Sequence, residues 1–228
     1  MDINTQKKMA AAFAVNYIKN GMTVGLGTGS TATYFINALN KKIKEENWNV
    51  TCVTTSSKSA SLAHSLGMNV VDIDDVENID VTVDGADEFD ENLNGIKGGG
   101  AALLFEKIVA ISSKKNIWIV DSSKQSKHLG SFKLPVEVVK FGANHIFNKL
   151  DKLSLHPDFR LTKSNEKLIT DSGHYIIDID IKEIADILEL SKTLKSFTGV
   201  VEHGLFINIC DIAIIGGKTV KILENHHK

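Results

Sequence analysis

The segment from Asp84 to Glu106 contains the charged side chains that are most able to do chemistry. It reads DGADE, then KGGG starting at Lys97, then Glu106 inside an apolar run. Glycine loses the most conformational entropy on folding, so the run Gly98–Gly100 indicates a place where a ligand approaches the main chain closely. We therefore expect the chemistry of the protein in this segment.

Asp84 and Asp87 are separated by Gly85 and Ala86 and follow a strand-like run that ends at Val83. Two carboxylates at a strand end can face one cleft, where they can bind a metal, act as acid and base, or accept hydrogen bonds from sugar hydroxyls. A turn or a helix cap is the simpler alternative, because aspartate commonly bonds the nearby backbone. Three further acids are expected to be solvated, namely Glu88, Asp90 and Glu91.

Lys97 and Glu106 flank the glycine run. A cation beside free backbone N–H groups can stabilise an oxyanion. Glu106 follows Ala102 by one helical turn, so it can lie near the loop end of the next helix. A partly desolvated glutamate has a raised pKa, which suits a general base near neutral pH. The alternatives are a solvent-facing lysine and an exposed Glu–Lys pair on a helix.

The segment Gly25–Thr31 reads GLGTGST between a strand-like run and a helix-like run. Backbone N–H groups at a helix N-terminus bind phosphate well, and Ser30 and Thr31 add hydroxyl donors. The spacing fits neither the dinucleotide fingerprint nor the P-loop. A tight turn without a ligand is the alternative. A second anion contact is expected from Lys124, in the run DSSK.

These motifs depend on alternating strands and helices. The patterns predict strands at 22–26, 50–54, 68–71, 79–83 and 116–120, and helices at 5–18, 32–44, 57–66 and 101–112. Such alternation predicts an α/β fold, a Rossmann-like and mostly parallel sheet with helices on both faces. Ligands bind outside the carboxyl ends of such strands. The motifs GTGST, DGADE and DSSK each follow a strand and should therefore converge.

The pattern changes after about residue 131. Strands are predicted at 134–139, 159–161, 168–170 and 175–180, the last three as an antiparallel ribbon, with helices at 144–153 and 184–195. Strands at 205–209 and 212–215 are expected to return to the first sheet. We therefore expect a Rossmann-like catalytic domain of residues 1–130 and 205–228. A smaller α+β domain of residues 131–204 would be inserted before the last strands.

Composition limits the class of protein. The chain has 228 residues, 43% of them hydrophobic, and a formal net charge of −2. This near-neutral balance gives no electrostatic case for binding nucleic acid or an anionic membrane. No apolar run reaches membrane-spanning length, and the start lacks a signal-peptide core. Cys52 and Cys210 are expected to be buried thiols rather than a disulfide or a zinc site, so we expect a cytoplasmic protein.

In combination, the motifs resemble the ribose-5-phosphate isomerase A family. Five of them carry the resemblance: GLGTGST, DGADE, KGGGAAL, EKI at 106–108, and DSSK. Three more extend it: LPVEVV at 134–139, Thr170-Asp171 with Gly173 and Tyr175, and GVVEHGLF at 199–206. The matches keep their order over nearly the whole chain. The set is specific to the family, whereas no single motif is.

The resemblance implies reversible isomerisation of D-ribose 5-phosphate and D-ribulose 5-phosphate through a cis-enediolate. It implies the non-oxidative branch of the pentose phosphate pathway, a homodimer or a dimer of dimers, and no metal or cofactor. Glu106 would be the general base and Lys97 the oxyanion stabiliser. Asp84 and Asp87 would bind hydroxyls, and Asp84 would also assist ring opening. The other implied substrate-binding residues are Thr28, Gly29, Ser30, Thr31, Gly85, Ala86, Gly98, Gly99, Gly100, Lys124 and Lys7.

Three other functions stay open at this point. A sugar-phosphate sensor would use the same cradle without a base, although no helix-turn-helix segment is recognisable. An acyl-CoA transferase would use Glu106 as a nucleophile, although the chain is short for that class. A metal-dependent sugar enzyme would use Asp84 and Asp87, and EDTA would abolish its activity.

Overall fold

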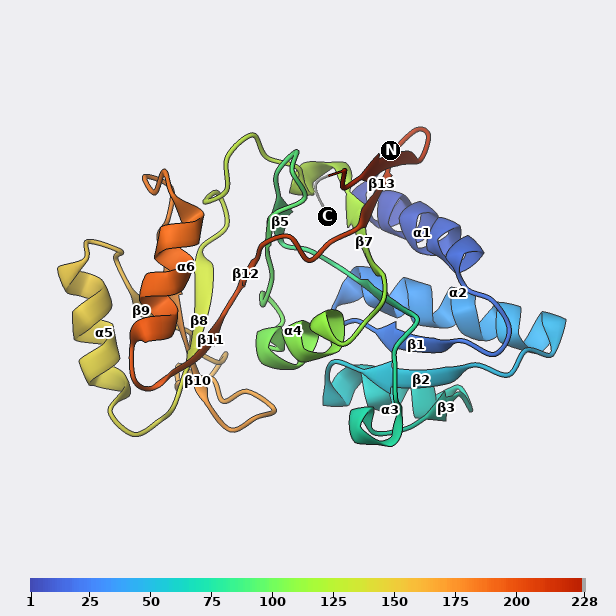
Figure 1. Ribbon diagram of the computed structural model, residues 1–228, viewed down its shortest axis with the longest axis horizontal. Coiled ribbons are helices and arrows are strands. Elements are labelled where there is room, and N and C mark those ends of the chain that lie inside the picture. Colours follow the sequence, from blue (N-terminus) through green and yellow to red (C-terminus); the bar gives the residue numbers. More distant parts are fainter. Residues whose placement is uncertain (227–228) are drawn as a thin grey trace.

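The computed structural model describes residues 1–226, so the last two residues of the expected range 205–228 lie outside that part. A seven-stranded sheet runs in the order β14-β13-β7-β4-β1-β2-β3 (Figure 1). Every neighbouring pair is parallel except β13–β14. The Rossmann-like prediction is thereby confirmed. The strands are β1 (Thr23–Leu26), β2 (Thr51–Thr54), β3 (Asn69–Val70), β4 (Val81–Asp84), β7 (Asn116–Asp121), β13 (Ile212–Gly216) and β14 (Lys221–Glu224).

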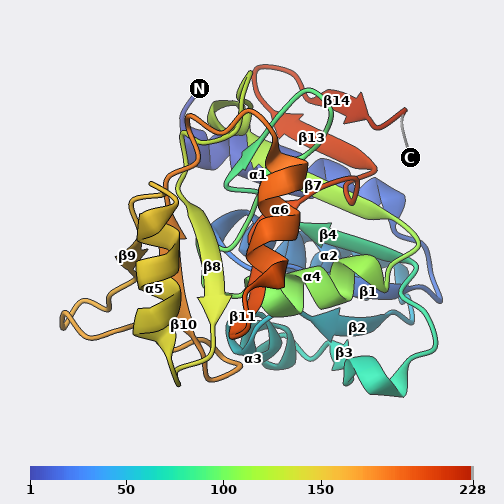
Figure 2. The same ribbon diagram turned by 60° about the vertical axis from the view of Figure 1, so that its left-hand side comes forward.

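Helices cover both faces of this sheet, as Figures 1 and 2 show. One face packs against α1 (Ile3–Ala14), α2 (Ser30–Glu46) and α3 (Ser57–Ser65), and the other against α4 (Leu103–Ile111). The side chains of β7 alternate, because a strand directs successive residues to opposite faces. Ile117 and Ile119 join the first core, whereas Trp118 and Val120 join the second. Single-turn 3₁₀ helices lie at Val15–Tyr17, Ile73–Asp75 and Ser122–Lys124.

A second, four-stranded antiparallel sheet has the order β11-β8-β10-β9. Its strands are β8 (Leu134–Val138), β9 (Asp158–Phe159), β10 (Tyr175–Ile179) and β11 (Val200–His203). Helices α5 (Ala143–Lys152) and α6 (Ile187–Ser196) pack against it through a separate apolar cluster. Helix α4 lies between the two sheets and contacts both β8 and β11 (Figure 1). Residues on the loop end of α4 are therefore shielded from both sides.

Two strand predictions are wrong. The segment 205–209 does not return to the first sheet, because β12 (Leu205–Phe206) pairs with β6 (Gly95–Ile96), which pairs with β5 (Glu88–Phe89). A strand of two residues has too little side-chain alternation to indicate which sheet it joins. The segment 168–170 makes only one isolated bridge, from Ile169 to Tyr175, and β9 pairs directly with β10. Four strands, β5, β6, β11 and β14, were not predicted at all.

Glu88 was expected to be solvated, and this expectation is also wrong. Its side chain is 2% exposed and accepts hydrogen bonds from the N–H groups of Gly130, Ser131 and Phe132, at 3.0, 3.2 and 3.0 Å. Three backbone donors compensate the carboxylate for the loss of water. Glu88 therefore fixes the segment that leads from β7 into the second sheet.

The two cysteines, Cys52 and Cys210, are buried as expected. Between residues 1 and 226, no helix is both long enough and apolar enough to cross a bilayer.

Candidate active site

The carboxyl ends of β1, β4 and β7 meet at one edge of the main sheet, where a cavity of about 110 Å³ opens. Every residue that lines it belongs to the predicted site. They are Lys7, Thr28, Gly29, Ser30, Thr31, Gly85, Ala86, Asp87, Lys97, Gly100, Glu106 and Lys124. Of the remaining predicted residues, Asp84 bonds Lys97 and Gly99 bonds Asp87, both in the lining, and Gly98 precedes Gly99 in the same loop. The predicted convergence at the sheet edge is therefore what the fold produces.

Asp84 ends β4 and is held by three groups. Its Oδ1 accepts hydrogen bonds from the Thr28 N–H at 2.9 Å and the Gly85 N–H at 2.7 Å. Its Oδ2 lies 2.9 Å from Lys97 Nζ. A Cβ atom on Gly27 would lie 2.0 Å from Oδ1, so only glycine at that position lets the carboxylate reach the Thr28 N–H. The glycine of the β1 turn thus ties that turn to β4.

Lys97 and Glu106 form a buried ion pair, with 3.2 Å between Nζ and Oε1. Their residues are 2% and 4% exposed, and Nζ also donates to the Gly85 carbonyl at 2.6 Å. Burial opposes the charge on Lys97, but Asp84 and then Glu106 outweigh it and raise the lysine pKa above its ordinary value. Lys97 therefore stays an ammonium.

The pKa of Glu106 is raised. Burial is the largest cause; Lys97 opposes it, and the negative charges of Asp84 and Asp87 reinforce it. The second oxygen, Oε2, is buried and makes no hydrogen bond with the described residues. A buried carboxylate oxygen without a donor is costly unless a ligand or a proton uses it. Glu106 therefore has one oxygen held by Lys97 and one available for proton transfer.

The glycine loop holds the remaining acid. Asp87 is half-buried, and its Oδ2 accepts a hydrogen bond from the Gly99 N–H at 2.7 Å. A Cβ atom on Gly99 would lie 2.5 Å from Asp87 Oδ1, so a larger residue would displace this carboxylate. We expected a ligand to approach the main chain of the glycine run closely. In the structure the Asp87 side chain makes such an approach, at Gly99.

The opposite end of the cavity suits an anion. Helix α2 starts at Ser30 after Gly29, which has φ of 102° and provides no side-chain cap. The first N–H groups of a helix lack acceptors within it and carry the positive end of its dipole. Lys7 Nζ lies 3.0 Å from Ser30 Oγ, and Lys124 lines the same space. Two lysines and the N-terminus of α2 thus provide positive charge and N–H donors for binding an anion at this end.

Sequence reasoning missed three neighbours of the site. The Thr28 hydroxyl bonds Thr55 Oγ1 at 2.7 Å and Ser56 Oγ at 2.8 Å, which fixes the threonine side chain. The Phe206 ring centroid lies 5.4 Å from Lys97 Nζ. Thr55 and Ser56 could have been suspected from the sequence, because they follow β2, which is parallel to β1 and ends at the same edge of the sheet. Phe206 gave none, because its strand β12 was assigned to the wrong sheet.

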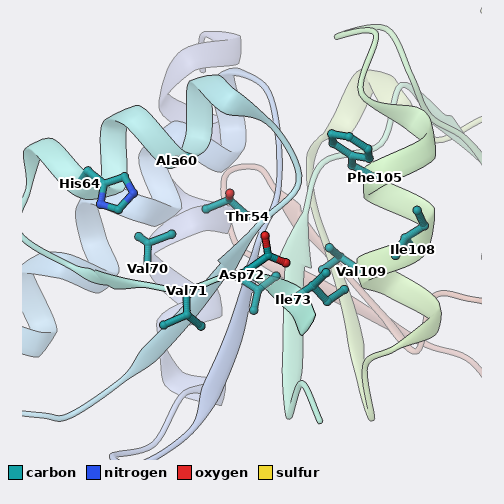
Figure 3. Close-up of a pocket in the computed structure, with 11 residues that line it drawn as sticks. Thr54, Ala60, His64, Val70, Val71, Asp72, Ile73, Phe105, Ile108 and Val109 are labelled. Atoms are coloured by element: carbon teal, nitrogen blue, oxygen red, sulfur yellow. The ribbon is translucent and has the colours of Figure 1, made fainter. Parts of the chain in front are cut away.

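A larger cavity, of about 490 Å³, lies between α3 and α4 (Figure 3). Its walls are mainly apolar, with Phe105, Ile108 and Val109 on α4. Its polar side chains are Thr54, His64 and Asp72, and its lining contains no lysine or arginine. It lacks the cations that a phosphorylated ligand needs, so the smaller and charged cavity is the better candidate.

Comparison with known proteins identifies one family. Residues 51–220 match the family model of ribose 5-phosphate isomerase A, also called phosphoriboisomerase A. The chain is 49% identical to the ribose-5-phosphate isomerase A of Levilactobacillus brevis, over 95% of each chain. It is 51% identical to that of Streptococcus uberis, over 96% of each chain.

Solved structures give the same result. The ribose 5-phosphate isomerase of Plasmodium falciparum superposes with a TM-score of 0.94 at 38% identity, covering 99% of this chain and 100% of that one. A D-ribose-5-phosphate isomerase in complex with phospho-erythronic acid gives 0.95 at 38% identity, covering 98% and 100%.

Proposed function

Because this chain belongs to the ribose 5-phosphate isomerase A family, its activity is the interconversion of ribose 5-phosphate and ribulose 5-phosphate, and we propose that Glu106 moves the proton. One observation carries the proposal. The buried Glu106 carboxylate and the buried Lys97 ammonium share a cavity with an anion cradle. An isomerase that acts on a sugar phosphate through an enediolate needs these three elements, which are a base, an electrophile and a phosphate anchor.

The phosphate binds the N-terminus of α2, with Lys7 and Lys124 as its charged partners. This anchor directs the other end of the open-chain sugar toward Glu106. We assign hydroxyl binding to Asp84 and Asp87, and a part in ring opening to Asp84. The positions of the two aspartates support these assignments. Asp87 lines the cavity, and Asp84, behind the lining, bonds the Thr28 N–H and Lys97.

The chemical step begins when Glu106 removes the proton from C2 of the aldose. The C–H electron pair forms the C1–C2 double bond, and the electrons of the C1 carbonyl move to O1. Lys97 and the backbone N–H groups of the glycine loop stabilise this oxyanion. Glu106 then returns the proton to C1, while the O2 hydroxyl proton passes to O1 and O2 becomes the carbonyl. The cis-enediolate is the intermediate, and no electron leaves the substrate.

A direct assay tests the function. Purified protein incubated with ribose 5-phosphate should produce ribulose 5-phosphate until the two sugars reach equilibrium. Unphosphorylated ribose should turn over far more slowly, because it lacks the anchor. Tight binding of ribose 5-phosphate without turnover would support a sensing role and overturn the enzymatic one.

We further propose that the chain divides into residues 1–130 with 205–228 and an inserted domain of 131–204. The support is that the two sheets have separate apolar cores.

We also propose a homodimer or homotetramer, because Phe141, Leu161 and Ile169 of the inserted segment are 96%, 47% and 55% exposed. Light scattering of wild type and Phe141→Asp tests this assembly. The proposed setting is the cytoplasm, and the proposed pathway the non-oxidative pentose phosphate branch.

A further inference from the structure

Arg160 is the one arginine in this sequence, in which lysine and arginine together number 26. It follows β9 in the second sheet, yet its side chain reaches the glycine loop of the candidate active site. Its Nη1 donates to the Gly98 carbonyl at 2.6 Å and lies 3.3 Å from the Gly99 carbonyl oxygen. Arg160 therefore connects the second sheet to the glycine loop at the edge of the main sheet.

Asp178 on β10 holds the guanidinium in place. Arg160 Nε lies 2.9 Å from Asp178 Oδ2, and Nη2 donates to Asp178 Oδ1. The two side chains are 15% and 17% exposed, so water competes little for this pair. A two-point pair with a carboxylate fixes the plane of the guanidinium and leaves another N–H group free to donate elsewhere. A lysine ammonium provides no such fork.

The geometry of the peptide bond carries this constraint into the site. In a trans peptide the C=O and the following N–H point in opposite directions. Because Arg160 holds the Gly98 carbonyl, the N–H of the same peptide, which belongs to Gly99, points away from it and reaches Asp87 Oδ2 at 2.7 Å. The same geometry applies to the peptide between Gly99 and Gly100. Its carbonyl, on Gly99, lies beside Arg160, so its N–H, on Gly100, points the other way, and Gly100 lines the cavity.

We infer that Arg160 is a positioning residue of the isomerase, because it clamps the Gly98 and Gly99 carbonyls and so aims the opposite N–H groups at Asp87 and at the substrate. Three successive glycines have few conformational limits of their own, so the loop depends on such contacts, of which the Ala101 N–H bond to the Gly98 carbonyl at 2.9 Å is another. Preorganised donors stabilise an oxyanion because they need not reorient during the reaction. The inference rests on the proposed function, since it assigns Arg160 to the same reaction.

A second contact between the same parts of the chain provides a matched control. The Ser57 N–H at the start of α3 donates to Asp171 Oδ2 at 2.8 Å. This bond also links the 131–204 segment to the main sheet region, but it does not touch the glycine loop. If Arg160 only holds the two parts together, loss of the Asp171 bond should have a similar effect on catalysis.

The experiment compares wild type, Arg160→Lys, Asp178→Asn and Asp171→Ala. We expect Arg160→Lys to lower kcat about 10- to 100-fold, because the donors lose their alignment. Asp178→Asn should also lower kcat, because it removes the charge that anchors the guanidinium.

In both variants KM for ribose 5-phosphate and inhibition by inorganic phosphate should stay within about threefold of wild type, because the phosphate anchor is intact. Inhibition by phospho-erythronic acid, whose carboxylate resembles the enediolate, should weaken with kcat. Asp171→Ala should keep the wild-type kcat.

Equal losses of kcat in Arg160→Lys and Asp171→Ala would overturn the inference, as would a loss confined to KM. A wild-type kcat in Arg160→Lys would also overturn it. If Arg160→Lys does not fold, Asp178→Asn decides by the same criteria. Wild-type protein without isomerase activity would overturn the proposed function itself, which makes the two failures distinguishable.

Discussion

The Lys97 ammonium lies 3.2 Å from Glu106 Oε1, with both side chains almost fully buried. This ion pair gives the proposed reaction a simple charge balance. When Glu106 accepts the C2 proton it loses its negative charge, and a new negative charge develops on the substrate oxygen. Lys97 then exchanges one anionic partner for another. The low dielectric around the pair makes this exchange effective.

Lys97→Met should lower kcat about 100- to 1,000-fold, because it removes the electrophile. It should also move the acid limb of the kcat/KM profile to higher pH, because Lys97 is the group that lowers the pKa of Glu106. The measurement is kcat/KM against pH for the variant and for the exposed control Lys41→Met. An acid limb that stays in place would show that Lys97 does not act on Glu106.

The wild-type pH profile is a separate prediction. Glu106 must be ionised to accept a proton, and burial raises its pKa above the ordinary 4.5. Activity should therefore be complete above the raised pKa and decline as the pH falls through it, with a midpoint well above 4.5. A profile of kcat/KM in ribose 5-phosphate measures this midpoint. A flat profile down to pH 4.5 would contradict the raised pKa.

Lys7→Gln and Lys124→Gln should each raise KM for ribose 5-phosphate about tenfold, since each removes a charged hydrogen bond to the phosphate. The kcat values should change little, because neither lysine contacts the reacting carbons in the proposal. Lys8→Gln is the matched control, since Lys8 is adjacent in sequence but exposed and absent from the cavity lining. An unchanged KM in both variants would show that the phosphate does not bind at this end of the cavity.

Metal removal should have no effect. The proposed oxyanion stabiliser is Lys97, and Asp84 and Asp87 already bond to it or to backbone N–H groups. Protein dialysed against EDTA should therefore keep its full kcat. A loss that Mg²⁺ restores would identify these aspartates as metal ligands.

The sequence predicts which segments meet at the candidate site, because parallel strands end at one edge of the sheet. Asp84, Thr28 and Lys124 lie at or just beyond the carboxyl ends of three strands, so their convergence depends only on recognising β4, β1 and β7. The order of the strands was not needed. The pattern of residue types also indicated a cation beside a base, although the 3.2 Å ion pair between Lys97 and Glu106 depends on packing that no local pattern contains.

What the sequence did not predict involves contacts between distant segments. Strand β12 has two residues and owes its place to pairing with β6, so its own pattern carries little information. Glu88 is buried because a loop more than forty residues later turns three N–H groups toward it. Arg160 acts across two sheets in the same way. Such partners are chosen by tertiary structure and not by spacing along the chain.

The most direct test of the account is the reaction of ribose 5-phosphate in D₂O with wild type and Glu106→Gln, with the exposed Glu91→Gln as control. Wild type and Glu91→Gln should form ribulose 5-phosphate with deuterium at C1, because the proton on Glu106 exchanges with solvent. Glu106→Gln should lower kcat about 100- to 10,000-fold and still bind the sugar phosphate. Near-normal turnover by Glu106→Gln would contradict the assignment of Glu106 as the base.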